Sequence, residues 1–229
     1  MKYKAIFFDR DGTLTYFNPE KEQWRNKTIE RWSGRPFELP YEKMMDLFNK
    51  ASKNRRPWYK NVEEEKSFML RFYKCLLEEE GINEKIDDRA TMLFSQLWCN
   101  NDRLLFPEVT NVLEYFKSKG FKMGVISDTS PSLQLTLEQL SIAHYFTSFT
   151  ASSLVGAGKP SPIIFNAALQ AEGVKAEESI YVDDYDVEAD GAREQGFTSF
   201  LIDRPGKQQG EWVINNLMGL IDYVKAKNY

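Results

Sequence analysis

The sequence of 229 residues predicts an α/β fold, in which a parallel sheet is covered by helices and a block of helices is inserted after the first strand. Three observations predict this class. The apolar run Ala5–Phe8 has the length of a buried strand, and it ends in two acidic residues and a glycine. Residues 16–102 show helical periodicity throughout. Beyond Pro107, helical stretches alternate with short apolar runs, which is typical of a parallel sheet.

The block from residue 16 to residue 102 is predicted to contain three or four amphipathic helices. Its apolar side chains recur at helical spacing in three sets: Met44, Met45, Phe48 and Ala51; Phe68, Phe72, Cys75 and Leu76; Ala90, Leu93, Phe94, Leu97 and Trp98. We expect Gly81 to end the second of these helices and Asp87 or Asp88 to cap the third. The predicted domains are therefore a core of residues 1–15 and 103–229 and a helical domain of residues 16–102.

The chain after this block is predicted to alternate between helices and strands. The expected helices cover residues 107–119, 133–140, 162–171, 188–195 and 212–224, and the expected strands cover residues 121–126, 148–151, 179–182 and 198–202. A parallel sheet of this kind brings the carboxyl ends of all its strands to one edge.

The composition excludes two classes of partner. The 34 acidic residues outnumber the 30 lysines and arginines, for a net charge of −4, whereas a nucleic-acid-binding protein normally presents a basic surface. No apolar run approaches the roughly twenty residues that span a bilayer, and residues 1–4 lead into a strand rather than a signal sequence. We expect a cytoplasmic protein without a membrane partner. Cys75 and Cys99 lack metal-site spacing and are expected to pack in the core.

Five residues with chemically active side chains stand between predicted elements: Asp9, Asp11, Ser127 and Asp184 near the ends of strands, and Lys159 just before a helix. Taken singly, each has an ordinary explanation as a turn residue, a solvated charge or a helix cap. The segment Gly156–Lys159 is not a P-loop, because Ser153 stands where the first glycine belongs and Pro160 follows the lysine.

The combination of these residues favours chemistry over a purely structural role. In a parallel sheet they converge on one crevice, and several carboxylates in one place repel one another unless a cation joins them. Oxygen ligands of this kind suit Mg²⁺. A magnesium ion, a hydroxyl group, a lysine and two closely spaced carboxylates are the components that phosphoryl transfer requires.

The chain resembles the haloacid dehalogenase superfamily, in its phosphatase-like branch with a helical cap after the first motif. The residues that carry the resemblance are Asp9-Arg10-Asp11-Gly12-Thr13, Val125-Ile126-Ser127, Lys159-Pro160, and Asp183-Asp184 with Gly191-Ala192, in the order of the family's four motifs. The resemblance implies a Rossmann-like parallel sheet with helices on both faces and an inserted helical cap. It also implies Mg²⁺-dependent hydrolysis of a small phosphorylated metabolite.

The resemblance assigns the catalytic and metal-binding roles. It makes Asp9 the nucleophile that forms an aspartyl phosphate and Asp11 the general acid and base. It places Mg²⁺ between the carboxylate of Asp9, the backbone carbonyl of Asp11 and Asp184.

The remaining motif residues are implied to bind the phosphoryl group or to support the site. Ser127, the backbone amide of Asp128 and Lys159 would hold the phosphoryl oxygens. Thr13 and Asp183 would lie next to these groups without binding the phosphoryl group themselves, and would orient the ligands.

Two positions depart from the family pattern. The fourth motif often reads Gly-Asp with a further Asp about one turn later, whereas this chain has Asp183-Asp184 and then Glu188. The roles of Asp186 and Glu188 therefore stay open, since both can be helix-start acids. Arg10 occupies a position where an apolar residue is common, and the sequence leaves open whether it meets the cap or solvent.

Several activities share this pattern. Halide leaves without a proton whereas an alkoxide needs one, so Asp11 favours a phosphatase or a sugar-phosphate mutase over a dehalogenase. A catalytically silent binding module is the other alternative. The basic segment of residues 50–60 can recognise a second anionic group, stack on a ring or simply face water, and the last of these is favoured. His144 is expected to be structural. The substrate and the oligomeric state are not predicted.

Overall fold

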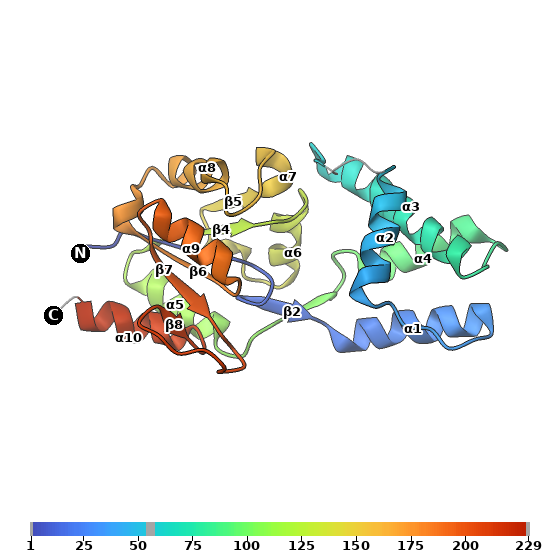
Figure 1. Cartoon of the computed structure of the whole chain (residues 1–229), viewed down its shortest axis with the longest axis horizontal. Helices are drawn as coiled ribbons and strands as arrows, with labels where there is room; N and C mark the ends of the chain where they lie inside the picture. The colour runs from blue at the N-terminus through green and yellow to red at the C-terminus, as the bar shows by residue number, and fades with distance from the viewer. Residues whose placement is uncertain (1, 54–57, 228–229) are drawn as a thin grey trace. The chain divides into compact units, whose positions relative to one another are not determined.

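The computed structural model describes residues 2–53 and 58–227, and the chain divides into two compact units (Figure 1). One unit comprises Met1–Tyr16 and Leu104–Tyr229, and the other comprises Phe17–Arg103. None of the helices in these described stretches combines the length and apolar character that crossing a membrane requires.

The first unit is built on a six-stranded parallel sheet. In spatial order its strands are β5 (Ser148–Ala151), β4 (Lys122–Ser127), β1 (Ala5–Phe8), β6 (Ser179–Asp183), β7 (Thr198–Ile202) and β8 (Val213–Ile214). The predicted α/β class is thereby confirmed. Strand β1 pairs with β4 on one side and β6 on the other, so its carboxyl end lies at the centre of the sheet.

Helices cover both faces of this sheet. The helices on one face are α8 (Pro162–Glu172) and α9 (Asp186–Glu194), and those on the other are α5 (Val109–Ser118), α6 (Leu133–Gln139) and α10 (Met218–Lys227). Side chains alternate along β1: Ala5 and Phe7 pack with the first set, and Ile6 and Phe8 pack with the second. All four are completely buried, which explains why this strand reads as a continuous apolar run. Short helices α7 (Ser152–Val155), η1 (Ala143–Tyr145) and η2 (Ala176–Glu178) complete the unit.

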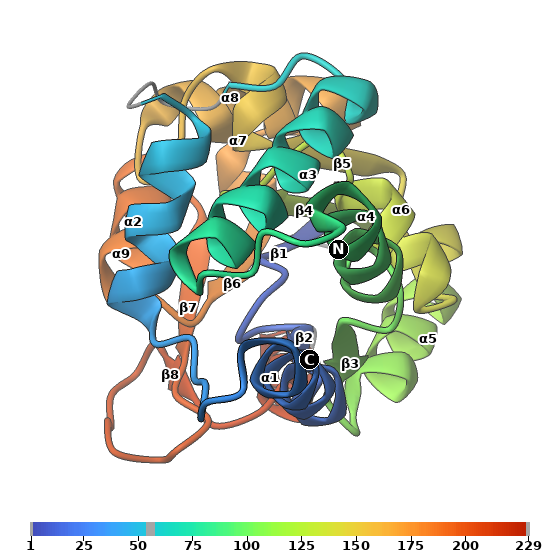
Figure 2. The same ribbon diagram turned by 90° about the vertical axis from the view of Figure 1, so that its right-hand side faces the viewer.

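The second unit is helical. It contains α1 (Pro19–Ser33), α2 (Tyr41–Ala51), α3 (Val62–Glu79) and α4 (Ile86–Leu97), with α3 packed against both α2 and α4 (Figure 2). Asn18 and Asn61 cap α1 and α3, and each side chain accepts a backbone N–H of the first turn. The chain enters and leaves this unit through the short strands β2 (Thr15–Phe17) and β3 (Arg103–Leu105), which form a two-stranded sheet.

The predicted starts of the last helix and of α4 are wrong. The last helix begins at Met218 rather than Trp212, because Val213 and Ile214 instead pair with β7 as strand β8. Helix α4 begins after Lys85, which has a left-handed backbone and makes no side-chain cap. Asp87 and Asp88 therefore lie in the first turn, where the helix dipole favours acidic residues.

The basic segment of residues 50–60 is only partly described, since residues 54–57 lie outside the described residues. Lys50 forms an ion pair with Glu79 of α3. The ring of Tyr59 is buried and lies 5.0 Å from the ring of Phe68, so this end of the segment packs into the helical core.

Candidate active site

Asp9 is the first residue beyond β1 and lies at the centre of the carboxyl edge of the sheet. Its backbone N–H donates to the carbonyl of Val182 on β6 at 2.9 Å, so the residue is tied to the neighbouring strand. Asp9 is only 5% exposed. The apolar strand thus delivers a nearly buried carboxylate to the position where parallel α/β sheets bind ligands.

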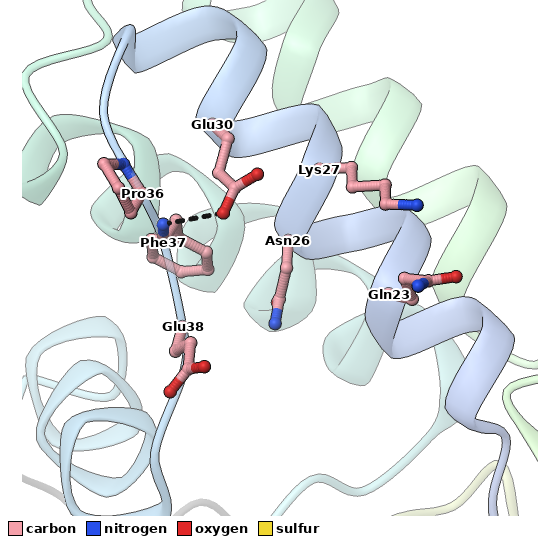
Figure 3. Close-up of a pocket in the computed structure, with 7 residues that line it drawn as sticks. All are labelled: Gln23, Asn26, Lys27, Glu30, Pro36, Phe37 and Glu38. Carbon is pink, nitrogen blue, oxygen red and sulfur yellow. Dashed lines mark hydrogen bonds between the residues drawn. The ribbon is translucent and has the colours of Figure 1, made fainter.

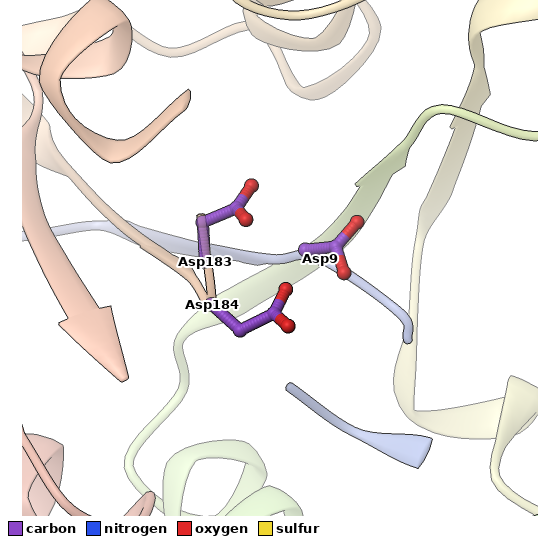
Figure 4. Close-up of side chains that lie close together, drawn as sticks. All are labelled: Asp9, Asp183 and Asp184. Carbon is purple, nitrogen blue, oxygen red and sulfur yellow. The ribbon is translucent and has the colours of Figure 1, made fainter. Parts of the chain in front are cut away.

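Asp183 and Asp184 meet Asp9 at this edge. Asp183 is the last residue of β6, Asp184 follows it, and carboxylate oxygens of the three residues all lie within 4.8 Å of one another (Figure 4). Asp183 is buried, whereas Asp184 is exposed. Such a group of oxygen donors suits a hard divalent cation.

Lys159 supplies positive charge to the same place. Its Nζ lies 2.8 Å from Asp9 Oδ1, 2.7 Å from Asp183 Oδ2 and 2.6 Å from Glu188 Oε2, and its side chain is 2% exposed. The backbone N–H of Lys159 donates to Asp128 Oδ1 at 3.0 Å, which anchors the loop that carries the lysine. Among the described residues, Lys159 is the one cation that pairs with these carboxylates.

The pKa values of the acids reflect, first, their removal from water and, second, the presence of several acidic groups around one lysine. Burial raises the pKa of Asp9 to about 8, and although Lys159 opposes this shift, Asp183 and Asp11 reinforce it. Although the residue as a whole is exposed, partial desolvation of its carboxyl group and the nearby charge of Asp183 raise the pKa of Asp184 to about 6. The pKa of Lys159 is raised well above its ordinary value, because the nearby acids outweigh the desolvation of its ammonium group. A second cation would relieve the remaining repulsion.

The hydrogen-bond donors around Asp183 distinguish it from the other two aspartates. Asp183 Oδ2 accepts from Lys159 and from the hydroxyl of Tyr181, and its Oδ1 accepts the backbone N–H of Tyr185 at 2.9 Å. These three donors already occupy its oxygens. Asp9 and Asp184 remain as the carboxylates that fit a divalent metal, and Asp183 fits a supporting position.

Gly12 allows Asp184 to approach the loop after β1. A methyl group placed on Gly12 would lie 2.0 Å from Asp184 Oδ2, which is closer than atoms in contact can be. The backbone of Gly12 also has φ of +79°, a conformation that L side chains rarely adopt. The glycine of the first motif is therefore needed both for the turn and for the space that the carboxylate occupies.

Asp11 lies beside this cluster, with both carboxylate oxygens bonded to neighbours on its own loop. Arg10 Nη2 donates to Asp11 Oδ2 at 2.7 Å, and Thr15 Oγ1 donates to Asp11 Oδ1 at 2.8 Å. The sequence left the place of Arg10 open, and in the structure this residue is buried.

The other predicted residues lie at the same edge with fewer direct contacts. Ser127 is the buried last residue of β4, the neighbour of β1 on the side away from β6. Asp128 is exposed, and its side chain accepts the backbone N–H of Lys159. Thr13 is fully buried, and its Oγ1 has no hydrogen-bond partner within the described part of the chain.

The sequence left the roles of Glu188 and Asp186 open, and it did not predict two further residues at the site, Tyr181 and Arg204. Glu188 contacts Lys159 directly, whereas Asp186 is exposed and its side chain accepts the N–H of Val187 at the start of α9. Tyr181 is buried beneath Asp183, but its place within an apolar strand gave no signal. Arg204 follows β7, a strand-end position that could have marked it.

Arg204 is far from the loop after β1 in the sequence but binds its backbone in the structure. Its Nε donates to the carbonyl of Gly12 at 2.8 Å and its Nη2 to the carbonyl of Thr13 at 2.5 Å. Its Nη1 lies 2.9 Å from Glu108 Oε1, and the guanidinium stacks on Phe106. This arginine therefore fixes the backbone of the loop that carries Asp9 and Asp11.

The helical unit contains a separate hollow of about 510 Å³ between α1 and residues 36–38 (Figure 3). Glu30 accepts the backbone N–H of Phe37 at 3.1 Å across one end of this hollow. None of the predicted site residues lines it.

Comparison with known proteins identifies the family of this chain. The model of the haloacid dehalogenase-like hydrolases matches residues 3–196. A glyceraldehyde 3-phosphate phosphatase of Methanocaldococcus jannaschii is 27% identical, with 97% of each chain covered. A phosphatase of Mycobacterium tuberculosis is 26% identical, with 96% of each chain covered.

Among solved structures, a 2-haloacid dehalogenase of Pseudomonas syringae pv. Tomato has the same fold. Its TM-score is 0.70, its sequence identity is 23%, and the match covers 98% of this chain and 99% of the other. At this identity the likeness supports the fold alone.

Proposed function

Because the chain belongs to the haloacid dehalogenase-like hydrolases, we propose that it is a Mg²⁺-dependent phosphatase that hydrolyses a small phosphorylated metabolite through an aspartyl phosphate. The observation that carries this proposal is the contact of Lys159 Nζ with Asp9 Oδ1 at 2.8 Å, beside Asp184. A buried carboxylate that is neutralised by a lysine, next to a second carboxylate that can hold a metal, is suited to attack an anionic phosphate ester.

In the first half of the reaction, a carboxylate oxygen of Asp9 attacks the phosphorus atom. A phosphorus–oxygen bond forms on Asp9 while the bond between phosphorus and the ester oxygen breaks. Asp11, in its protonated form, donates a proton to the departing oxygen. An alcohol and an aspartyl phosphate result.

In the second half, Asp11 has become a carboxylate and accepts a proton from a water molecule. The oxygen of this water attacks phosphorus, and the bond to Asp9 breaks. Inorganic phosphate leaves, and both aspartates return to their starting states.

We propose that a magnesium ion would be held by Asp9, Asp184 and the backbone carbonyl of Asp11; the closeness of the Asp9 and Asp184 carboxylates supports the first two of these ligands. When bound, this ion neutralises charge on the phosphoryl oxygens. Lys159 reduces the repulsion between Asp9 and the anionic substrate, and Ser127 and the backbone amide of Asp128 bind phosphoryl oxygens from the neighbouring strand.

The helical unit is proposed to act as a cap that recognises the rest of the substrate. The relative from M. jannaschii is named for a three-carbon phosphate ester and matches almost the whole of this chain, including the helices. We infer that the substrate is a metabolite of comparable size.

The presence of Asp11 favours this activity over that of the structurally similar dehalogenase. A halide ion leaves without a proton, so dehalogenation does not need an acid two residues after the nucleophile. A mutase that transfers the phosphoryl group to a second hydroxyl is the remaining alternative. It would use the same aspartates, and it would release little inorganic phosphate.

The test is the release of inorganic phosphate from p-nitrophenyl phosphate in the presence of Mg²⁺. Asp9→Asn should lower the rate by at least about 10³-fold, because the nucleophile is lost. Asp186→Asn is the matched control, since Asp186 is an exposed aspartate at the same edge, and it should retain activity. Comparable phosphate release by Asp9→Asn and the wild-type protein would refute the proposed nucleophile.

A further inference from the structure

Arg10 is a buried arginine within the loop that carries the two catalytic aspartates. Its side chain is 5% exposed, against 35% for Asp11, and its Nη2 lies 2.7 Å from Asp11 Oδ2. Its Nε is buried and has no hydrogen-bond partner in the described stretches of the chain. Burying a guanidinium is costly unless the charge is paired, and an apolar side chain would fill this place at lower cost. A functional role for the contact between Arg10 and Asp11 would explain why an arginine is buried at this position.

Thr15 completes the arrangement on the other side of Asp11. Its hydroxyl lies 2.8 Å from Asp11 Oδ1 and 3.2 Å from the backbone carbonyl of Arg10. The carboxylate of Asp11 is thus held at both oxygens, by one charged and one neutral donor.

The backbone of the loop makes this clamp rigid. The carbonyl of Arg10 accepts the N–H groups of Leu14 and Thr15, each at 2.8 Å, and Gly12 N–H donates to Thr15 O at 2.7 Å. Arg10 and Thr15 therefore have a fixed separation, and their donors define one position for the carboxylate between them. Residues in a rigid, hydrogen-bonded loop hold a catalytic group more accurately than solvent does.

We propose that Arg10 is a positioning residue that, together with Thr15, holds the carboxyl group of Asp11 where it exchanges protons with the leaving group and with water. This inference rests on the proposed function and adds to it a residue outside the usual apolar pattern of the first motif. Arg10 touches neither substrate nor phosphorus in this role. Arg10 acts through Asp11 alone, so substituting it should matter only where proton transfer by Asp11 matters, and this can be tested.

The first test compares two substrates of similar shape. Phenyl phosphate releases a basic phenolate that needs a proton, whereas 2,4-dinitrophenyl phosphate releases an anion that needs none. Arg10→Met should lower kcat/KM for phenyl phosphate by about 10- to 100-fold, since general acid catalysis contributes about 10²- to 10⁴-fold. For 2,4-dinitrophenyl phosphate kcat/KM should change less than about threefold, because its leaving group needs no proton. The parameter kcat/KM reports only the steps up to the departure of the leaving group, so the later hydrolysis of the aspartyl phosphate does not affect it. Equal losses on the two substrates would overturn the proposal.

The second test is a double-mutant cycle with Asp11→Asn. If Arg10 acts only through Asp11, Arg10→Met should have less than about a threefold further effect on phenyl phosphate in the Asp11→Asn protein. Additive losses would show that Arg10 acts elsewhere and would overturn the proposal.

Two further variants separate positioning from folding. Arg193→Met is the matched control, because Arg193 also pairs with an aspartate, Asp190, and also has a buried Nε without a hydrogen-bond partner in the described chain. It should leave the ratio of the two kcat/KM values unchanged. If Arg10→Met does not fold, Thr15→Val removes the other donor, and it should reduce kcat/KM for phenyl phosphate selectively.

The outcomes also distinguish this inference from the proposed function. If neither the wild-type protein nor Asp9→Asn hydrolyses either ester in the presence of Mg²⁺, both the proposed function and the role of Arg10 are overturned. A wild-type protein that hydrolyses both esters, with Arg10→Met unchanged on phenyl phosphate, overturns only the role of Arg10.

Discussion

Lys159 and Asp9 form a buried ion pair across 150 positions of sequence, with 2.8 Å between Nζ and Oδ1. The same ammonium group contacts Asp183 at 2.7 Å, so a single lysine joins the acids at the ends of β1 and β6. This lysine thereby links the stability of the site to its chemistry.

Lys159→Met should impair both properties. Removing one partner of a buried pair typically costs about 3–5 kcal/mol, because the other partner is left without compensation. Because we propose that Lys159 also binds a phosphoryl oxygen of the substrate, its loss should lower kcat by about 10²- to 10³-fold. Urea unfolding in the absence of metal measures the first effect, and phosphate release measures the second.

Lys4→Met is the control for this variant. Lys4 pairs with Glu178 at 2.6 Å, but its side chain is 59% exposed, and exposed pairs contribute little to stability. A Lys159→Met protein as active and as stable as Lys4→Met would contradict the role given to Lys159.

Asp11→Asn should separate metal binding from proton transfer. The proposed contact of Asp11 with Mg²⁺ uses its backbone carbonyl, which the substitution leaves in place. We therefore expect Mg²⁺ to raise Tm as in the wild-type protein, while hydrolysis of phenyl phosphate slows by about 10²-fold or more. Loss of the Mg²⁺-dependent rise in Tm together with activity would argue against this division.

Asp184→Asn and Asp183→Asn should differ, although the two residues are adjacent. Asp184 is exposed and suited to the metal, so its substitution should raise the Mg²⁺ concentration for half-maximal activity by about tenfold or more. Asp183 is buried among three donors, so its substitution should mainly lower the free energy of unfolding. Titrating each variant with Mg²⁺ and unfolding each without metal measures the two effects. The reverse pattern would exchange the assigned roles.

Gly12→Ala should abolish the Mg²⁺-dependent activity, because the added methyl group would occupy the place of the Asp184 carboxylate. Gly120→Ala is a close control. Gly120 has nearly the same φ, +78°, but a methyl group there would meet nothing within 4 Å. Its substitution should cost only about 1 kcal/mol of backbone strain and leave activity intact. Equal activity in the two alanine variants would show that the close approach of Asp184 is not required.

Much of the fold followed from local patterns in the sequence. The strand Ala5–Phe8 has the predicted bounds because a central parallel strand is buried on both faces and needs an unbroken apolar run. The strands at residues 148–151 and 198–202 also begin and end as predicted. The predicted final helix was too long, because pairing of Val213 with β7 is a long-range contact that local periodicity does not report.

The sequence by itself determined which residue types stand at the carboxyl ends of the strands, because strand length, turn residues and motif order are local properties of the chain. Asp9, Asp11, Ser127 and Asp184 could be named in this way, and Lys159 could be named from its place in the loop before a predicted helix. Only the tertiary structure decided their partners. Lys159 meets Asp9 and Asp183, Tyr181 supports Asp183, and Arg204 holds the loop at Gly12, through contacts between distant segments.

The same division applies to Arg10. Its position between two aspartates is visible in the sequence, but its side chain could as well have faced solvent. In the structure it is buried instead, and the nearby carboxylate of Asp11 balances its charge there. Burial and the choice of charge partner depend on the whole fold, because the cost of a charge is set by the surroundings that exclude water from it.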